Sequence, residues 1–450
     1  MTSSPPTPIH SAAPPESAPS GPKTFWPRWR LAPGPVIAPD ERLPWPATIL
    51  MGAQHVVAMS GATILAPLLM GFDPNLAILF SGIGTLLFFL VTGGRLPSYL
   101  GSSFAFIAVA VAASGYGGHG PNPHPELALG GIVAAGALYA AIGLLVMATG
   151  GHWIERLLPP VVTGTIGMAI GLNLAPVATQ GLTGQGVPFL ASLVTILAVS
   201  LVAAHAPPAL SRISLLIGTV LAYGFYALLA NGMGLAAPID FSAVREAAWF
   251  GLPAFRAPAF TAHAVSLIAP VAIVLVAENL GHIKALGAMT GRDFDRLMGR
   301  AFLGDGLATM LAGAAGGTGV TTYAENMGVM AITRTYSTLV FIMAALFAIG
   351  LGLSPKFGAV LRTIPAPVLS GLATIVFGLI AAAMVRVWVV HRVDLSDVRN
   401  LLTIGVALIL GAGNFTVTMG GASIGGIGTA TIAAIMLNQI LRRSQSKRLT

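Results

Sequence analysis

The sequence predicts an all-α polytopic membrane protein with fourteen transmembrane segments. Of its 450 residues, 55% are hydrophobic and only 8% are charged. Soluble domains carry roughly 25% charged residues, so this chain has too few charges to cover a water-facing surface. Apolar runs recur along it, and a spanning helix needs about 20 apolar residues. The composition therefore argues against a soluble enzyme, and the absence of cysteine removes disulfides and Cys–zinc sites.

The apolar segments follow a tail over residues 1–45 that is rich in Pro, Ser and Ala and that we expect to be disordered. Segments three and ten are short and interrupted by small polar residues, so we expect both to break inside the membrane. The fourteen predicted segments are about 46–69, 74–92, 97–113, 127–149, 158–175, 188–206, 211–232, 264–284, 299–315, 319–333, 337–353, 363–384, 398–413 and 423–441.

The distribution of basic residues predicts the topology. With a cytoplasmic N-terminus, Arg245, Arg256, Lys356 and Arg362 are the four of the 23 Lys and Arg residues that fall outside. The other residues fall on the cytoplasmic side, as the positive-inside rule requires. Their scatter in short clusters beside apolar runs argues against a nucleic-acid surface. We therefore expect a bacterial inner (plasma) membrane protein with both termini in the cytoplasm.

Two pairs of motifs indicate an internal repeat. Pro160-Val-Val-Thr-Gly164 opens segment five, and Pro367-Val-Leu-Ser-Gly371 opens segment twelve. Ser102-Ser-Phe-Ala-Phe106 in segment three matches Thr321-Thr-Tyr-Ala-Glu325 in segment ten, except at the last position. Each pair lies seven segments apart, which is an odd number, so the two halves have opposite orientations. The sequence thus predicts a 7+7 inverted repeat, a transporter architecture whose site lies where broken helices meet.

Five ionisable residues lie inside the apolar segments, where they are costly and mark functional sites. They are His55, Glu278, His282, Asp305 and Glu325. Glu278 and His282 are four residues apart and share one helix face. For His55 a structural histidine is an equally good interpretation, and for Asp305 it is the better one. The placement of Glu278 and Glu325 on matching halves favours function.

The residue types around these carboxylates favour a small, planar, neutral ligand. Two carboxylates accept from N–H groups, and backbone N–H groups freed in broken segments donate to carbonyl oxygens. Phe104, Phe106 and Tyr323 offer ring faces. A membrane-embedded enzyme would need a nucleophile or metal motif that the sequence lacks, and a passive channel would hardly need paired carboxylates beside aromatic rings.

The motifs at these positions resemble the nucleobase/ascorbate transporter family. The resemblance covers about residues 46–441 and is closest to the bacterial uracil permeases, particularly the pyrimidine permeases of the Rut uracil-degradation pathway. It rests on Gln54-His55, Gly101-Ser-Ser-Phe-Ala-Phe106, Ala277-Glu-Asn-Leu-Gly-His282 and Thr322-Tyr-Ala-Glu-Asn-Met-Gly328 with Thr333.

This resemblance implies two domains and short strands in segments three and ten. The implied core domain comprises residues 46–150 (segments 1–4) and 264–354 (segments 8–11). The implied gate domain comprises residues 151–263 (segments 5–7) and 355–441 (segments 12–14), and residues 442–450 form a cytoplasmic tail. The resemblance also implies elevator-like alternating access and a homodimer.

For the site, the resemblance implies that Glu278 and Glu325 bind the base. The backbone N–H groups of Phe104 and Ala324 meet its carbonyls, and the Phe104 ring packs on it. Tyr323 joins the substrate-binding set and, with His55, supports the second carboxylate, whereas His282 serves proton coupling. Glu325 stands where purine-transporting relatives usually carry Gln. The implied activity is uracil:proton symport with the proton as coupling ion and no cofactor, and a purine or xanthine permease is the alternative.

Overall fold

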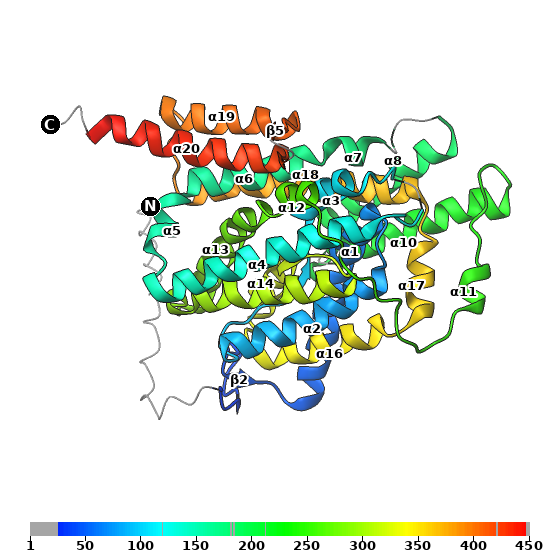
Figure 1. Cartoon of the computed structure of the whole chain (residues 1–450). Coiled ribbons are helices and arrows are strands. Elements are labelled where there is room, and N and C mark those ends of the chain that lie inside the picture. Colours follow the sequence, from blue (N-terminus) through cyan, green and yellow to red (C-terminus); the bar gives the residue numbers. More distant parts are fainter. Residues whose placement is uncertain are drawn as a thin grey trace, which may run out of the picture.

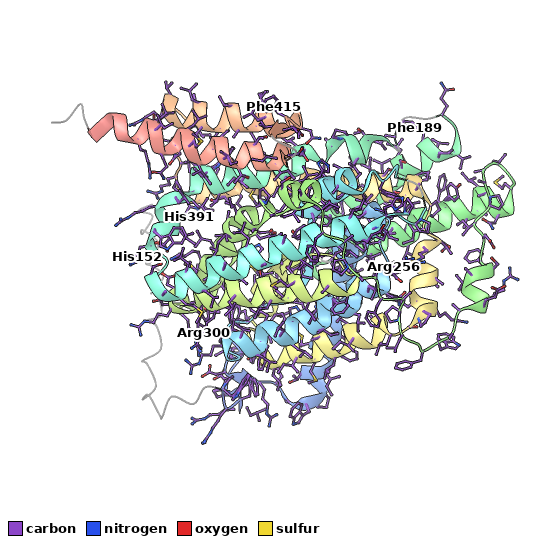
Figure 2. All side chains as sticks on the ribbon, viewed as in Figure 1. His152, Phe189, Arg256, Arg300, His391 and Phe415 are labelled. Atoms are coloured by element: carbon purple, nitrogen blue, oxygen red, sulfur yellow. The ribbon has the colours of Figure 1, made fainter. Side chains whose placement is uncertain are left out.

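The computed structural model describes residues 26–118, 120–180, 182, 185–211, 213–419 and 422–446. Within these residues the chain is mostly helical, with three two-stranded sheets. Most of the long helices run roughly side by side, so that the loops gather at two ends (Figure 1). His152, Arg300 and His391 lie at one end, and Arg256 lies toward the other (Figure 2).

The main helices of the first half are α1 (Trp45–Met70), α2 (Pro74–Thr92), α3 (Ile107–Ser114), α4 (Pro125–Thr149), α6 (Pro160–Asn173), α8 (Val187–His205) and α10 (Ser214–Ala227). Those of the second half are α13 (Val271–Thr290), α14 (Met298–Ala315), α15 (Ala324–Thr333), α16 (Thr338–Gly352), α17 (Pro355–Arg362), α18 (Ala366–Val390), α19 (Val398–Ala412) and α20 (Gly426–Ser446).

Short helices and strands connect them. The short helices are α5 (His152–Leu157), α7 (Ala175–Gln180), α9 (Pro208–Ser211), α11 (Ser242–Glu246), α12 (Ala262–Ile268), the 3-10 turns η1 (Phe104–Phe106) and η3 (Asp295–Leu297), and the π turn η2 (Leu228–Gly232). The strands are β1 (Arg30–Leu31), β2 (Glu41–Arg42), β3 (Leu100–Ser102), β4 (Val320–Thr322), β5 (Val417–Met419) and β6 (Ala422–Ile424).

Eight spans within the described residues are long and apolar enough to cross a membrane. The pair α16 and α17, bent by 78°, makes a ninth candidate. Helices α3 and α15 contain 8 and 10 residues. At 1.5 Å per residue they reach about half of the roughly 30 Å hydrocarbon core. The predicted breaks in segments three and ten are therefore confirmed, whereas the number of fourteen crossings stays a prediction.

Small residues bring α4 and α14 close together. A Cβ on Gly136 of α4 would lie 2.8 Å from the carbonyl oxygen of Gly306 on α14. A Cβ on Gly143 would lie 2.9 Å from that of Gly299. Membrane helices associate through such small-residue contacts, because lipid provides no hydrophobic drive between them. The contact fixes α14, and with it the buried Asp305, against α4.

Residues 26–44, which the sequence assigns to a disordered tail, pack on the helices. Ile37 is only 3% exposed and pairs with Thr335 as a parallel bridge. Trp29 donates its indole N–H to Thr338 Oγ1 at 3.0 Å and stacks on Phe89 with 5.9 Å between ring centroids. The expected tail is thus wrong from residue 26 onward, because these apolar side chains find partners at the ends of α2, α15 and α16. Residues 1–25 lie outside the described part of the chain.

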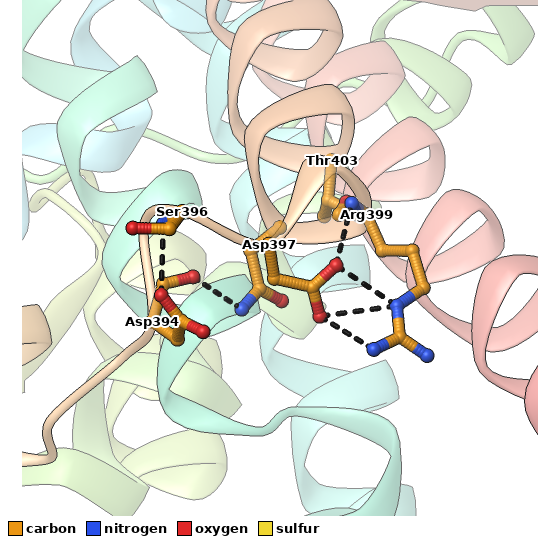
Figure 3. Close-up of polar contacts among 6 residues, drawn as sticks. Asp394, Ser396, Asp397, Arg399 and Thr403 are labelled. Atoms are coloured by element: carbon orange, nitrogen blue, oxygen red, sulfur yellow. Dashed lines mark hydrogen bonds and ion pairs between the residues drawn. The ribbon is translucent and has the colours of Figure 1, made fainter.

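The turn between α18 and α19 is held by its own carboxylates (Figure 3). Asp394 Oδ1 accepts the backbone N–H of Ser396 at 2.8 Å, and Asp397 caps α19 by accepting the N–H of Arg399 at 3.0 Å. The Arg399 guanidinium also donates to Asp397 and holds the pKa of that carboxyl below its usual range. The stabilisation that ionised Asp397 gives to this turn is lost only as the pH falls through that lowered pKa.

Candidate functional site

The site is built around the paired strands β3 and β4, at which predicted segments three and ten meet. We call this strand pair the crossing. Strand β3 pairs antiparallel with β4, with Leu100 opposite Thr322 and Ser102 opposite Val320. The outer edges are bonded to helices, because Thr85 Oγ1 on α2 accepts the Leu100 N–H at 2.9 Å and Thr309 Oγ1 on α14 accepts the Val320 N–H at 3.2 Å. Within a membrane, non-helical backbone is tolerated only where its polar groups are bonded in this way.

A helix begins directly after each strand. Phe104 is the first residue of η1, which continues into α3, and Ala324 is the first residue of α15. The first N–H groups of a helix have no partner inside it and carry a partial positive charge. The crossing therefore offers two sets of backbone donors to a ligand, at the two residues for which the family resemblance implies contacts with carbonyl groups.

Tyr323 and Phe106 hold the crossing together. The Tyr323 hydroxyl donates to the Ser102 carbonyl oxygen at 2.7 Å, and its ring fills the space above Gly101, where a Cβ would overlap it. The fully buried Phe106 ring covers Gly319 in the same manner. The expectation that all three aromatic rings offer free faces is therefore wrong for these two. Phe104 alone is half-exposed, and its ring meets Phe377 of α18 edge-on at 5.9 Å.

Helix α13 presents the first carboxylate beside the crossing. Glu278 and His282 are both half-buried, one turn apart. His282 Nδ1 lies 2.7 Å from Thr322 Oγ1 of β4, which ties α13 to the strand pair. Glu278 lies within electrostatic range of Glu325, the second residue of α15. The structure thus brings together Glu278, His282 and Glu325 from predicted segments eight and ten.

His55 supports α15 from α1. Its Nδ1 lies 3.0 Å from the side-chain nitrogen of Asn326, which also donates to the His55 carbonyl oxygen at 3.2 Å. The imidazole packs against the Phe341 ring with 4.8 Å between centroids. His55 is fully buried, so it positions the helix that carries Glu325. Asn326 was not among the predicted site residues, although it directly follows Glu325 in the quoted motif.

A second buried polar cluster lies behind Glu278. Asp305 Oδ2 accepts from the Asn279 side-chain amide at 2.8 Å and from the Tyr139 hydroxyl at 3.3 Å. Asn279 also donates to the Tyr139 hydroxyl at 2.9 Å. All three are fully buried. The cluster fixes α13 between α4 and α14, which supports the structural interpretation of Asp305.

These groups can recognise a planar molecule with both N–H and C=O groups. Two carboxylates supply acceptors, two helix N-termini supply donors, and Phe104 supplies a ring face. In the described part of the chain, no cluster of three or more His, Cys, Asp or Glu residues is suited to a metal ion. A cavity of about 700 Å³ lies elsewhere, between Asp73, Tyr226, Asp240 and Arg362.

Comparison with known families decides the class of protein. The model of the Permease family, Xan_ur_permease, matches residues 46–420. The chain belongs to this family. It is therefore an integral membrane transporter and not an enzyme.

Curated relatives extend over nearly the whole chain. "Putative pyrimidine permease RutG" of Escherichia coli (strain K12) is 57% identical over 422 residues, covering 93% of this chain and 96% of that protein. "Uracil permease" of Bacillus caldolyticus is 40% identical and covers 90% of this chain and 95% of that protein. "Uracil permease" of Escherichia coli (strain K12) is 36% identical, with coverage of 90% and 94%.

Solved structures share the fold. The transmembrane domain of the cyanobacterial bicarbonate transporter BicA superposes with a TM-score of 0.60 at 18% identity, over 86% of this chain and 97% of that one. The inward-facing murine anion transporter Slc26a9 has a TM-score of 0.60 at 12% identity, over 89% and 69%. The predicted class of helical membrane transporter is thus confirmed.

Proposed function

We propose that the protein imports uracil together with protons across the bacterial inner membrane. The observation that carries this proposal is that α13, which bears Glu278, contacts through His282 the strand that leads into Glu325, beside the N-termini of η1 and α15. The uracil and pyrimidine permeases among its relatives support the same class of substrate.

Uracil matches the donors and acceptors of the site. The base carries two N–H groups and two carbonyl groups in one plane. Glu278 and Glu325 accept from the N–H groups, and the backbone N–H groups at Phe104 and Ala324 donate to the carbonyls. The half-exposed Phe104 ring covers one face of the base. Tyr323 and His55 act on the base indirectly, because each holds the backbone that positions α15.

His282 is the proposed proton-coupling residue. It lies one turn from Glu278, and its Nδ1 is engaged with Thr322. A protonated imidazole favours an ionised Glu278 that is ready to accept from the base, and loss of the proton to the cytoplasm weakens this arrangement. Glu278 or Glu325 as the proton carrier is the competing assignment.

Transport requires the site to face each side in turn. We propose a core domain of residues 46–150 and 264–354 that moves past a gate domain of residues 151–263 and 355–441, as seven-segment inverted repeats permit. The correspondence of β3 with β4 and of α3 with α15 supports this division. Both termini are proposed to be cytoplasmic, and the protein is proposed to form a homodimer.

Uptake by proteoliposomes tests the proposal. Labelled uracil should accumulate when the outside is acidic, and a protonophore should abolish the accumulation. Unlabelled uracil should compete fully, whereas xanthine should compete weakly. Stronger competition by xanthine would assign the purine alternative, and the absence of any base accumulation would refute the symporter.

A further inference from the structure

Two short helices, α5 and α17, begin the two residue ranges assigned above to the gate domain, and they lie at opposite ends of the molecule. Each is the linker between the last core helix and the first long gate helix. Helix α5 joins α4 to α6, and α17 joins α16 to α18 (Figure 1). Each is followed by prolines, at Pro159-Pro160 and at Pro365-Ala366-Pro367. Proline restricts the residue before it and removes a helix N–H, so each linker ends at a defined joint before the gate helix begins.

Helix α17 is fixed to the core along its length. Arg362 at its end forms an ion pair with Asp73, the N-cap of α2, at 3.1 Å. Asn75 in the first turn of α2 donates to the Ser354 carbonyl oxygen at 2.7 Å, directly before α17. Gly358 has no space for a side chain, since a Cβ there would overlap the Asn75 amide. The first turn of α2 therefore holds both ends of this linker.

Helix α5 is fixed to the core by a lysine. Lys284 Nζ lies 2.6 Å from Glu155 Oε1 on α5 and 2.7 Å from Asp295 Oδ1, three residues before α14 begins. Lys284 belongs to α13, two residues after His282. One ammonium group thus joins the linker, the helix that carries Glu278, and the start of α14.

The two arrangements correspond under the proposed inverted repeat. Helices α2 and α14 are the second segments of the two halves, and α5 and α17 follow the fourth segments. The aspartate at the start of the second segment of each half is joined to the linker of the other half. Asp73 pairs with Arg362 directly, whereas Asp295 reaches Glu155 through Lys284, because both of these side chains are acidic.

At the start of α17, Lys356 donates its backbone N–H to the Ala248 carbonyl oxygen at 3.0 Å, and its ammonium lies over the Trp249 ring. At its proline end, each linker makes one uncharged hydrogen bond with a gate helix. Gln439 of α20 donates to the Arg156 carbonyl oxygen at 3.0 Å, and the hydroxyls of Tyr223 and Thr363 lie 2.9 Å apart. The core contacts are ionic and involve two or three partners. The contact with a gate helix at the proline end of each linker is a single neutral hydrogen bond, and such bonds are weaker than charge-assisted ones.

We propose that Lys284 and Arg362 are positioning residues that keep the two linkers attached to the core throughout the transport cycle. This inference rests on the proposed function. The linkers then travel with the helix that carries Glu278 and His282. The gate-side contacts at Gln439 and Tyr223 break instead, and bending occurs at the proline joints.

Removing the charges should slow transport without weakening binding. Lys284→Met and Arg362→Gln should each lower the uracil transport rate about two- to fivefold, because partly exposed ion pairs are worth little individually. The uracil Kd should change less than twofold, and Lys284→Arg should retain the rate. Arg292→Gln is the matched control, since it breaks an ion pair with Asp40 away from both linkers. A loss of affinity equal to the loss of rate would assign Lys284 a structural role instead.

Cross-linking tests whether each linker moves with the core or stays with the gate. The chain has no native cysteine that would react with the reagent. Glu155→Cys with Lys284→Cys, and Asp73→Cys with Arg362→Cys, are joined by a short bis-methanethiosulfonate reagent, which forms a reducible disulfide with each cysteine as methanesulfinate leaves. Transport should then persist or recover. The same reagent across Arg156→Cys and Gln439→Cys should block transport until a reductant is added. Reversible block by the core-side link would overturn the proposal. Wild-type uptake in the same vesicles separates this outcome from failure of the proposed function.

Discussion

His282 Nδ1 on α13 lies 2.7 Å from Thr322 Oγ1 on β4, so the predicted proton-coupling residue touches the strand that leads into Glu325. A change in the charge of the imidazole therefore acts directly on the backbone that positions the second carboxylate. His282→Ala should retain uracil binding and exchange but lose accumulation driven by a pH gradient. Counterflow and gradient-driven uptake in proteoliposomes measure the two properties separately.

The Thr322 contact provides a graded control for this experiment. Thr322→Ser keeps a hydroxyl and should accumulate uracil normally, whereas Thr322→Val removes the partner of His282 and should lower accumulation at equal binding. Full gradient-driven accumulation by His282→Ala would instead place the coupled proton on Glu278 or Glu325.

The two carboxylates should each be required for affinity. Glu278→Gln and Glu325→Gln replace a charged acceptor by an amide, and a charge-assisted hydrogen bond is worth roughly 1.5–3 kcal/mol. Uracil Kd should therefore rise about 10- to 100-fold. Calorimetry on the purified protein measures this, with Glu246→Gln on the exposed α11 as the control. Unchanged Kd in both site variants contradicts the assignment of the site.

The Phe104 ring should contribute through contact area. Base–aromatic stacking is worth about 1–3 kcal/mol, so Phe104→Ala should weaken uracil binding about 5- to 150-fold. Phe104→Tyr should be milder because it keeps the ring. Its partner Phe377 offers a comparison, since Phe377→Leu removes the edge-on contact but no proposed ligand contact. Normal uracil affinity in Phe104→Ala would leave the ring with a packing role only.

We expect the N-terminal segment to contribute to stability only from residue 26 onward. Deletion of residues 2–25 should leave transport and thermal stability unchanged, because this stretch has few apolar residues to bury. Deletion of residues 2–42 also removes Ile37, Trp29 and the Asp40 partner of Arg292. The melting temperature in detergent should then fall by several degrees. Equal melting temperatures for the two truncations would show that the packing of Trp29 and Ile37 contributes nothing.

The sequence predicted the site where chemistry and spacing agree. Two short, interrupted segments with matching motifs correctly predicted two broken helices, and the resemblance to a known family implied the strands within them. The cost of buried carboxylates singled out Glu278 and Glu325 as candidates. The sequence could not say which aromatic rings face the ligand. Phe104 and Tyr323 occupy matching positions, yet the Tyr323 ring packs over Gly101 of the opposite strand, whereas the Phe104 ring stays half-exposed beside Phe377. That choice depends on the small Gly101, which belongs to the other half of the chain.

The sequence also could not predict contacts between residues that lie far apart along the chain. Asn326 and His55 are 271 residues apart, and Asn279 and Asp305 lie on different helices. No periodicity in one segment encodes such pairs. The tail was wrongly predicted to be disordered for a related reason. Trp29 bonds to Thr338, 309 residues away, and Ile37 pairs with Thr335, and the composition of the tail shows neither contact.

The pairing of β3 with β4 also constrains how the protein is made. Ser102 and Thr318, which are hydrogen-bonded across the crossing, are 216 residues apart. At about 5–20 residues per second, a ribosome needs roughly 10–45 s to reach the second partner after the first. During that interval the polar backbone of β3 has no strand to bond in the membrane. The nascent first half must therefore wait in a partly hydrated or protected form, which makes biogenesis the stage at which substitutions at this crossing act first.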